Sequence, residues 1–202
     1  MLRRGLLVPA AILLAACSSE PSASNEGASP DNEISVTDSA AEAFSALPTR
    51  SGPRRQTTGN VPHIQLDAEL VPEIDAELRR RVFLLPGIED RPSDRSLPGA
   101  RGLAVSDDLV LARPDVIAGS NEFAHIHPDG SLHVWLAVDR AVEVDEKKWG
   151  ELHPWVDRDG FWDGVVMIYT PETLDELDVT MQILVDAYNY VTGSDLSPAD
   201  IP

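Results

Sequence analysis

The chain has 202 residues, of which 34 are acidic and 16 are basic, so its formal net charge at pH 7 is -18. This excess repels phosphate backbones and anionic head groups, so we expect no nucleic-acid partner and no membrane contact through basic residues. The length suits one domain with a further N-terminal segment.

The N-terminus has the features of an export signal. Two arginines precede a short apolar run that ends on Cys17, the only cysteine of the chain. Residues 14–17, Leu-Ala-Ala-Cys, resemble the bacterial lipobox, which implies cleavage before Cys17 and attachment of lipid, including palmitate, to it. We therefore expect a signal peptide at 1–16 and a protein anchored in the cell envelope, periplasm-facing or in the outer membrane. A plain secretory signal or an uncleaved anchor is the alternative.

Residues 17–60 are predicted to form a flexible tether behind the lipidated cysteine, since they are rich in Ser, Ala, Pro, Gly and acidic residues. We expect the folded domain to occupy residues 61–197. A thiol bonded to lipid is neither a nucleophile nor a metal ligand, so any chemistry of this domain must use other side chains.

The first expected elements of the domain are a helix and a hairpin. Apolar residues at a spacing of four predict a helix that starts at Pro72 and ends before Pro86. Residues 88–99 are polar and contain proline, so we expect a loop there. The β-prone runs 103–105 and 109–112 predict a hairpin.

A second hairpin is predicted over residues 121–137. His127-Pro128-Asp129-Gly130 favours a type I turn followed by a left-handed glycine. In this register His125 lies opposite His133. Ala124, Ile126 and Val134 then share one face of the strands, and the histidines share the other.

The remaining elements are a short helix over 138–149 ended by Gly150, a strand over 165–169, and a long helix from the cap Thr170 to Gly193. Together they predict an α+β fold, in which a small antiparallel or mixed sheet carries the histidine-bearing hairpin and helices pack on its apolar face.

The candidate site is the histidine face of this hairpin. His125, His127 and His133 fall close enough there for their imidazoles to share a metal ion or an anionic group. His153, with the carboxylate of Glu151, joins them if its loop folds over the same face. The alternative is a solvated or merely structural role, because antiparallel sheets commonly expose one polar face.

Several segments resemble the luciferase-domain family of small bacterial and fungal proteins. They are residues 122–133, 148–154 and 166–169, and a C-terminal helix that ends in Tyr-x-x-Val-Thr-Gly. The similarity runs from about Leu78 to Gly193, with Lys148 as a departure from the expected glycine. The family name implies light-producing oxidation. The resemblance makes His125, His127, His133, Glu151 and His153 matching motif positions, and it implies no established role for them.

Three hypotheses follow. In the first, a lipid-anchored envelope protein binds a small polar ligand on the histidine-lined face. In the second, a metal-assisted hydrolase or oxygenase uses His125, His127 and His133 as ligands of a divalent metal and Glu151 as the base. In the third, the domain is a structural or partner-binding lipoprotein. The residues alone leave open whether the protein is an enzyme.

Overall fold

An antiparallel sheet of six strands organises residues 44–201, which are the residues that this computed structural model describes. All of them lie in one compact unit. The predicted signal peptide and the lipidation site Cys17 lie outside the described residues. Within the described part, no helix has both the length and the apolar character needed to cross a bilayer.

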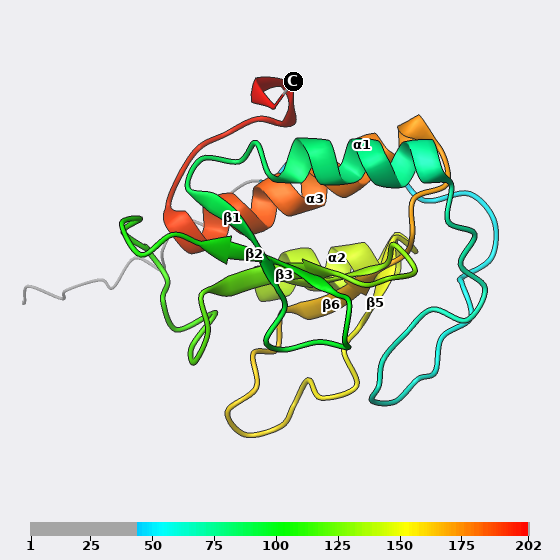
Figure 1. Cartoon of the computed structure of the whole chain (residues 1–202). Coiled ribbons are helices and arrows are strands. Elements are labelled where there is room, and N and C mark those ends of the chain that lie inside the picture. The colour runs from blue at the N-terminus through cyan, green and yellow to red at the C-terminus, as the bar shows by residue number, and fades with distance from the viewer. Residues whose placement is uncertain (1–43, 202) are drawn as a thin grey trace, which may run out of the picture. The chain divides into compact units, whose positions relative to one another are not determined.

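The strands pair in the order β1-β2-β3-β4-β6-β5 (Figure 1). They are β1 (Ile88–Pro92), β2 (Arg101–Val105), β3 (Glu122–Ile126), β4 (Leu132–Trp135), β5 (Gly150–Leu152) and β6 (Val165–Ile168). The helices are α1 (Pro72–Val82), α2 (Val138–Glu146), α3 (Leu174–Thr192) and the short 3-10 helix η1 (Pro198–Asp200). The predicted α+β fold is confirmed, and the sheet is antiparallel at every pairing.

The predicted turn between β3 and β4 is confirmed. The amide of His127 donates to the carbonyl of Ser131 at 2.8 Å, and Gly130 has a φ of +85°. Residues that have a side chain are strained at a positive φ, so glycine suits this position. The turn sets His125 opposite His133, as the sequence predicts.

The helices bury the apolar face of the sheet. α3 contacts β3 and β4, and α1 lies along α3, as Figure 1 shows. Ile74, Leu78 and Val82 of α1 are buried, which confirms the predicted helix from Pro72. α2 packs against β5 and β6. The helices therefore leave the opposite face of the sheet uncovered, and the polar residues of the site lie on that face.

Two predictions in the first half of the domain are wrong. Residues 88–92 form β1 rather than a loop, and β1 pairs with β2, whereas residues 109–112 form no strand. β1 is an edge strand whose side chains are mostly exposed, so it lacks the apolar alternation that marks a half-buried strand.

Two helix boundaries also differ. α2 ends at Glu146, and Gly150 lies in β5, where a Cβ would stand 2.1 Å from the carbonyl oxygen of Met167. α3 begins after Thr173, whose side chain accepts a hydrogen bond from the amide of Glu176. Thr170, the predicted cap, instead donates its hydroxyl to the carbonyl of Asp129 at 2.9 Å.

Residues 44–66, here called the strap, run over the domain. The carboxylate of Glu143 accepts from the amide of Leu47 at 2.8 Å, and the carbonyl of Pro48 accepts from the indole of Trp149 at 2.6 Å. Arg50 pairs with Glu176 at 2.9 Å. Residues 44–60, which the sequence analysis assigns to the tether, thus contact the domain and bring residue 63 to the polar face of the sheet.

Candidate functional site

The site lies along one row of directly paired residues across the sheet. The row runs through Gly102, His125, His133, Met167 and Glu151, each from a different strand. Because side chains alternate along strands, all five positions present the same face, opposite to the face that the helices cover. Hairpin register alone therefore brings two imidazoles and a carboxylate onto one surface.

All five histidines of the chain meet on this face. His125 and His133 come from the row, His127 from the turn after β3, His153 from the segment after β5, and His63 from the strap. Every one is buried, with exposed fractions between 1% and 8%. The predicted set of four histidines is thus brought together, and His63 adds a fifth member that the sequence analysis did not include.

A buried carboxylate holds His125. Nδ1 of His125 lies 2.6 Å from Oε1 of Glu122, and the same oxygen accepts from the hydroxyl of Ser93 at 2.8 Å. Since a carboxylate only accepts, Nδ1 of His125 donates. The other ring nitrogen, Nε2, then faces Nδ1 of His133 at 3.0 Å.

A serine and an aspartate hold His127. Nδ1 of His127 lies 2.9 Å from the hydroxyl oxygen of Ser131, and that hydroxyl donates to Asp129 at 2.7 Å. Because the serine proton is committed to the carboxylate, the serine oxygen accepts from Nδ1 of His127. A neutral His127 therefore has its free lone pair on Nε2.

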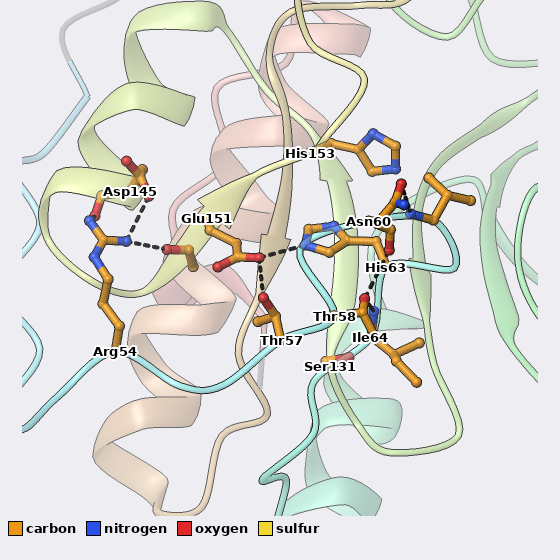
Figure 2. A network of polar contacts seen from close by, with 12 residues as sticks. Arg54, Thr57, Thr58, Asn60, His63, Ile64, Ser131, Asp145, Glu151 and His153 are labelled. Atoms are coloured by element: carbon orange, nitrogen blue, oxygen red, sulfur yellow. Dashed lines mark hydrogen bonds and ion pairs between the residues drawn. The ribbon is translucent and has the colours of Figure 1, made fainter.

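The strap and β5 hold His63 (Figure 2). Nε2 of His63 lies 2.6 Å from Oε1 of Glu151, and the hydroxyl of Thr57 donates to the same oxygen at 2.7 Å. Arg54 anchors this part of the strap by pairing with Asp145 at 2.7 Å. Nδ1 of His63 faces Nε2 of His133 at 3.1 Å. Glu151, the predicted base, is thus engaged with His63.

His153 has the opposite tautomer. Its Nδ1 accepts from the backbone amide of Trp155 at 3.1 Å, so a neutral His153 has its proton on Nε2. The ring also stacks on Phe161, with centroids 4.8 Å apart. His153 therefore offers a hydrogen-bond donor where His127 offers an acceptor.

Burial disfavours the charged form of three of the imidazoles. Removal from water, reinforced by the neighbouring histidines, lowers the pKa of His127 to about 3 and that of His153 to about 4. The same causes hold the pKa of His133 well below its ordinary value. Burial acts to raise the pKa of Glu151, but hydrogen bonds from His63 and Thr57 outweigh it, so the net pKa is lowered. The floor of the site thus combines the neutral imidazoles of His127, His133 and His153 with the ionised carboxylate of Glu151.

A pocket of about 510 Å³ opens above the histidines. All five imidazoles line it, and its walls are largely apolar, formed by residues that include Leu97, Trp135, Trp155, Phe161 and Val165. Arg95 also lines the pocket, with its guanidinium carbon 5.3 Å from the ring centre of Trp135. The pocket has the size and the mostly apolar lining of small-molecule sites, with a few convergent polar groups.

Two sets of three histidines have the spacing of metal ligands among the described residues. One ring nitrogen from each of His125, His127 and His133 lies within 4.8 Å of the other two, and the same holds for His63, His133 and His153. Neutral imidazole nitrogens are the form that binds metal. The first set is the one that the sequence predicts.

The fold and site define a small α+β domain with a buried histidine pocket. Residues 120–187 match the family model of the luciferase domain. Proteins named luciferase from Armillaria mellea, Armillaria gallica and Armillaria ostoyae are 26% identical over 171 residues, which cover 73% of this chain. The chain thus contains a luciferase-like domain, matched over residues 120–187.

The similarity to these relatives is partial. The matched region spans 62% of the length of the fungal luciferases. No solved structure is significantly similar to the chain.

Three residues of the site were not predicted from the sequence, namely His63, Glu122 and Arg95. His63 is the one histidine that lies far from the others in sequence, and only the path of the strap brings it to the sheet. Glu122 stands three residues before His125, a spacing that places its carboxylate on the wrong face of a regular strand. It reaches His125 because a bulge between Leu103 and Ala104 shifts the pairing of β2 with β3.

Proposed function

We propose that this luciferase-like domain binds a small organic molecule in the pocket above the five histidines. The observation that carries this proposal is the pocket itself, which is large enough for such a ligand and concentrates the polar side chains on its floor. A merely solvated histidine face would be open to water, whereas each of these imidazoles is at least nine-tenths buried.

The lining favours a ligand with an apolar, flat body and a polar edge. Trp135, Trp155 and Phe161 supply ring faces for the body. On the floor of the metal-free site, Nε2 of His127 accepts a hydrogen bond and Nε2 of His153 donates one, so the edge of the ligand needs both a hydroxyl and an acceptor oxygen. This refines the small polar ligand of the sequence analysis to an amphipathic one.

A metal-assisted oxygenase or hydrolase acting on this ligand is the second candidate. The two histidine sets with metal-ligand spacing favour it, and the fungal relatives named luciferase favour oxidation over hydrolysis. Glu151 is less suited to act as the base than the sequence analysis expects, because His63 and Thr57 both occupy its Oε1.

We further propose that lipid on Cys17 holds the domain in the bacterial cell envelope. The lipobox-like residues 14–17 and the net charge of -18, which disfavours direct contact with anionic lipids, support this. Mass spectrometry of the membrane fraction tests it: the N-terminal peptide should begin at a lipid-modified Cys17, and Cys17→Ser should abolish the modification. An unmodified Cys17 in mature protein contradicts the anchor.

Thermal unfolding in the presence of a panel of planar phenols tests the ligand pocket. We expect at least one phenol to raise Tm in a concentration-dependent way, whereas its saturated cyclohexanol counterpart does not. Trp155→Ala removes a wall and should abolish the increase, while the surface variant Val110→Ala should retain it, since Val110 is 85% exposed. An unchanged Tm throughout the panel, or an increase that persists in Trp155→Ala, contradicts the proposal.

A further inference from the structure

The polar floor of the site is one continuous chain of hydrogen-bonding groups. Four contacts join its five members in the order Glu122, His125, His133, His63, Glu151. The outer contacts are 2.6 Å long, and the imidazole-to-imidazole contacts are 3.0 and 3.1 Å. At such distances each contact needs one proton between its two atoms.

When their imidazoles are neutral, these five side chains hold too few protons to form all four hydrogen bonds. Carboxylates contribute none, and each neutral imidazole contributes one, so three imidazoles serve three of the four contacts. The carboxylates draw the protons of His125 and His63 to the outer contacts. His133 then serves only one of its two neighbours, and at the other contact two lone pairs face each other. One positive charge is needed there.

The position of His127 indicates where that charge belongs. Its ring centre lies 4.7 Å from that of His133 and 5.1 Å from that of His125, so a third imidazole stands beside this contact. Ser131 already holds the proton of His127 on Nδ1, which leaves the lone pair of Nε2 for a ligand. We propose that His125, His127 and His133 bind one divalent transition-metal ion.

A metal ion between His125 and His133 replaces the contact that lacks a proton, and each of the other three contacts then has one proton. Nε2 of His125 and Nδ1 of His133 then bind metal, and the proton of His133 moves to Nε2, where it is donated to Nδ1 of His63. His63 in turn donates from Nε2 to Glu151, and His125 donates from Nδ1 to Glu122. All the imidazoles stay neutral, which suits their burial.

The outer partners have the arrangement that metal-binding histidines commonly show. Such histidines donate their second ring nitrogen to a carboxylate, a carbonyl or another acceptor, which orients the ring. Here Glu122 does this for His125, and Ser131 with Asp129 does it for His127. His63 with Glu151 does it for His133. Each proposed ligand therefore has its own buried or half-buried support.

The other histidine set is less suitable because of His153. The amide of Trp155 occupies the Nδ1 lone pair of His153, so its neutral ring has a proton rather than a lone pair on Nε2. Only two nitrogens, from His63 and His133, remain there. His153 is left to donate a hydrogen bond to an organic ligand.

Three imidazoles select a first-row transition metal such as Zn²⁺, Fe²⁺ or Cu²⁺ over Mg²⁺ and Ca²⁺, which prefer oxygen ligands. With three protein ligands, at least one coordination position is left for water or for an oxygen of the ligand in the pocket. This inference deepens the second candidate function at the same site, but binding of metal can be measured without any organic ligand.

Titration of metal-free full-length protein with Zn²⁺ and Co²⁺ tests the inference. We expect one equivalent of Zn²⁺ by calorimetry and elemental analysis, and visible absorption from the Co²⁺ complex typical of nitrogen ligation. His127→Ala should abolish stoichiometric binding, whereas His153→Ala, the matched control from the other set, should retain it. Ser131→Ala, which keeps all the ligands, should weaken binding by about 10–100-fold. Circular dichroism establishes that each variant is folded, and Ser131→Ala replaces His127→Ala if the latter is not.

A folded wild-type protein that holds no stoichiometric Zn²⁺ overturns the proposal, because an extra proton must then supply the missing charge. Loss of binding in His153→Ala but not in His127→Ala or Ser131→Ala also overturns it, since the other set would then be the site. A phenol that still raises the Tm of metal-free protein supports the ligand pocket independently, so failure of the metal site and failure of the pocket are distinguishable.

Discussion

Gly102 lies directly opposite His125 on the neighbouring strand, and the carboxylate of Glu122 occupies the space that a side chain at position 102 would fill. A Cβ on Gly102 would stand 2.3 Å from Oε2 of Glu122. The glycine thus admits the carboxylate that fixes the tautomer of His125.

We predict that Gly102→Ala weakens Zn²⁺ binding by about 10–100-fold, the usual effect of losing an outer partner of a metal ligand. The reason is that the added methyl group displaces Glu122 from His125. Glu122→Ala, which removes the acceptor, should have a similar effect, and the double variant should be no weaker than either single one, because both changes remove the same hydrogen bond. Additive losses in calorimetric titrations would show that Gly102 acts by another route.

The packing of the strap against the rest of the domain can be tested separately, by its effect on stability. Leu47 is 4% exposed and belongs to the core, so Leu47→Ala should lower the free energy of unfolding by about 2–5 kcal/mol. Leu66→Ala is the matched control, because Leu66 is 60% exposed and should change stability by less than about 0.5 kcal/mol. Equal effects in urea unfolding would contradict the packing of the strap.

The buried ion pair of Arg140 joins the strap to α2 and α3. Arg140 pairs with Asp186 and donates to the carbonyl of Ser45 at 3.0 Å. Arg140→Met should destabilise the protein by about 3–5 kcal/mol, since it leaves a buried carboxylate without its partner. The double variant with Asp186→Leu should recover part of this loss in urea unfolding. A single variant as stable as wild type would exclude the ion pair as a structural contact.

Metal-free protein should lose stability on acidification. The pKa of folded His127 is about 3, below its ordinary value of 6.5, so between these values the unfolded chain binds more protons. Stability is therefore fully present above about pH 6.5 and falls as the pH drops toward 3. His153 acts in the same direction with a pKa of about 4. Tm measured from pH 7.5 downward should start to fall near pH 6.5; a constant Tm down to pH 5 would contradict neutral histidines.

Local sequence determines much of this fold and part of the site. The turn from His127 to Gly130 sets the register, and the register places His125 opposite His133, so the centre of the site is predictable from a short segment. The helix from Pro72 is likewise visible in its apolar spacing. Lys148, where the family resemblance implies glycine, has a φ of +66°, which explains why glycine suits that position.

The remaining site residues depend on long-range contacts. His63 joins His133 across 70 positions and Glu151 across 88, and no periodicity reports such a contact. Glu122 needs both the bulge at Phe123 in β3 and the empty space at Gly102. β1 is polar because it is an edge strand, so its composition resembles that of a loop.

The most direct test of the central claim is the anomalous scattering of crystals of the full-length protein grown with Zn²⁺, recorded at the zinc absorption edge. The account predicts one strong peak bounded by Nε2 of His125, Nε2 of His127 and Nδ1 of His133, with His63 hydrogen-bonded to His133 behind it. A peak held instead by His63 and His153, or no peak at this face of the sheet, would contradict it.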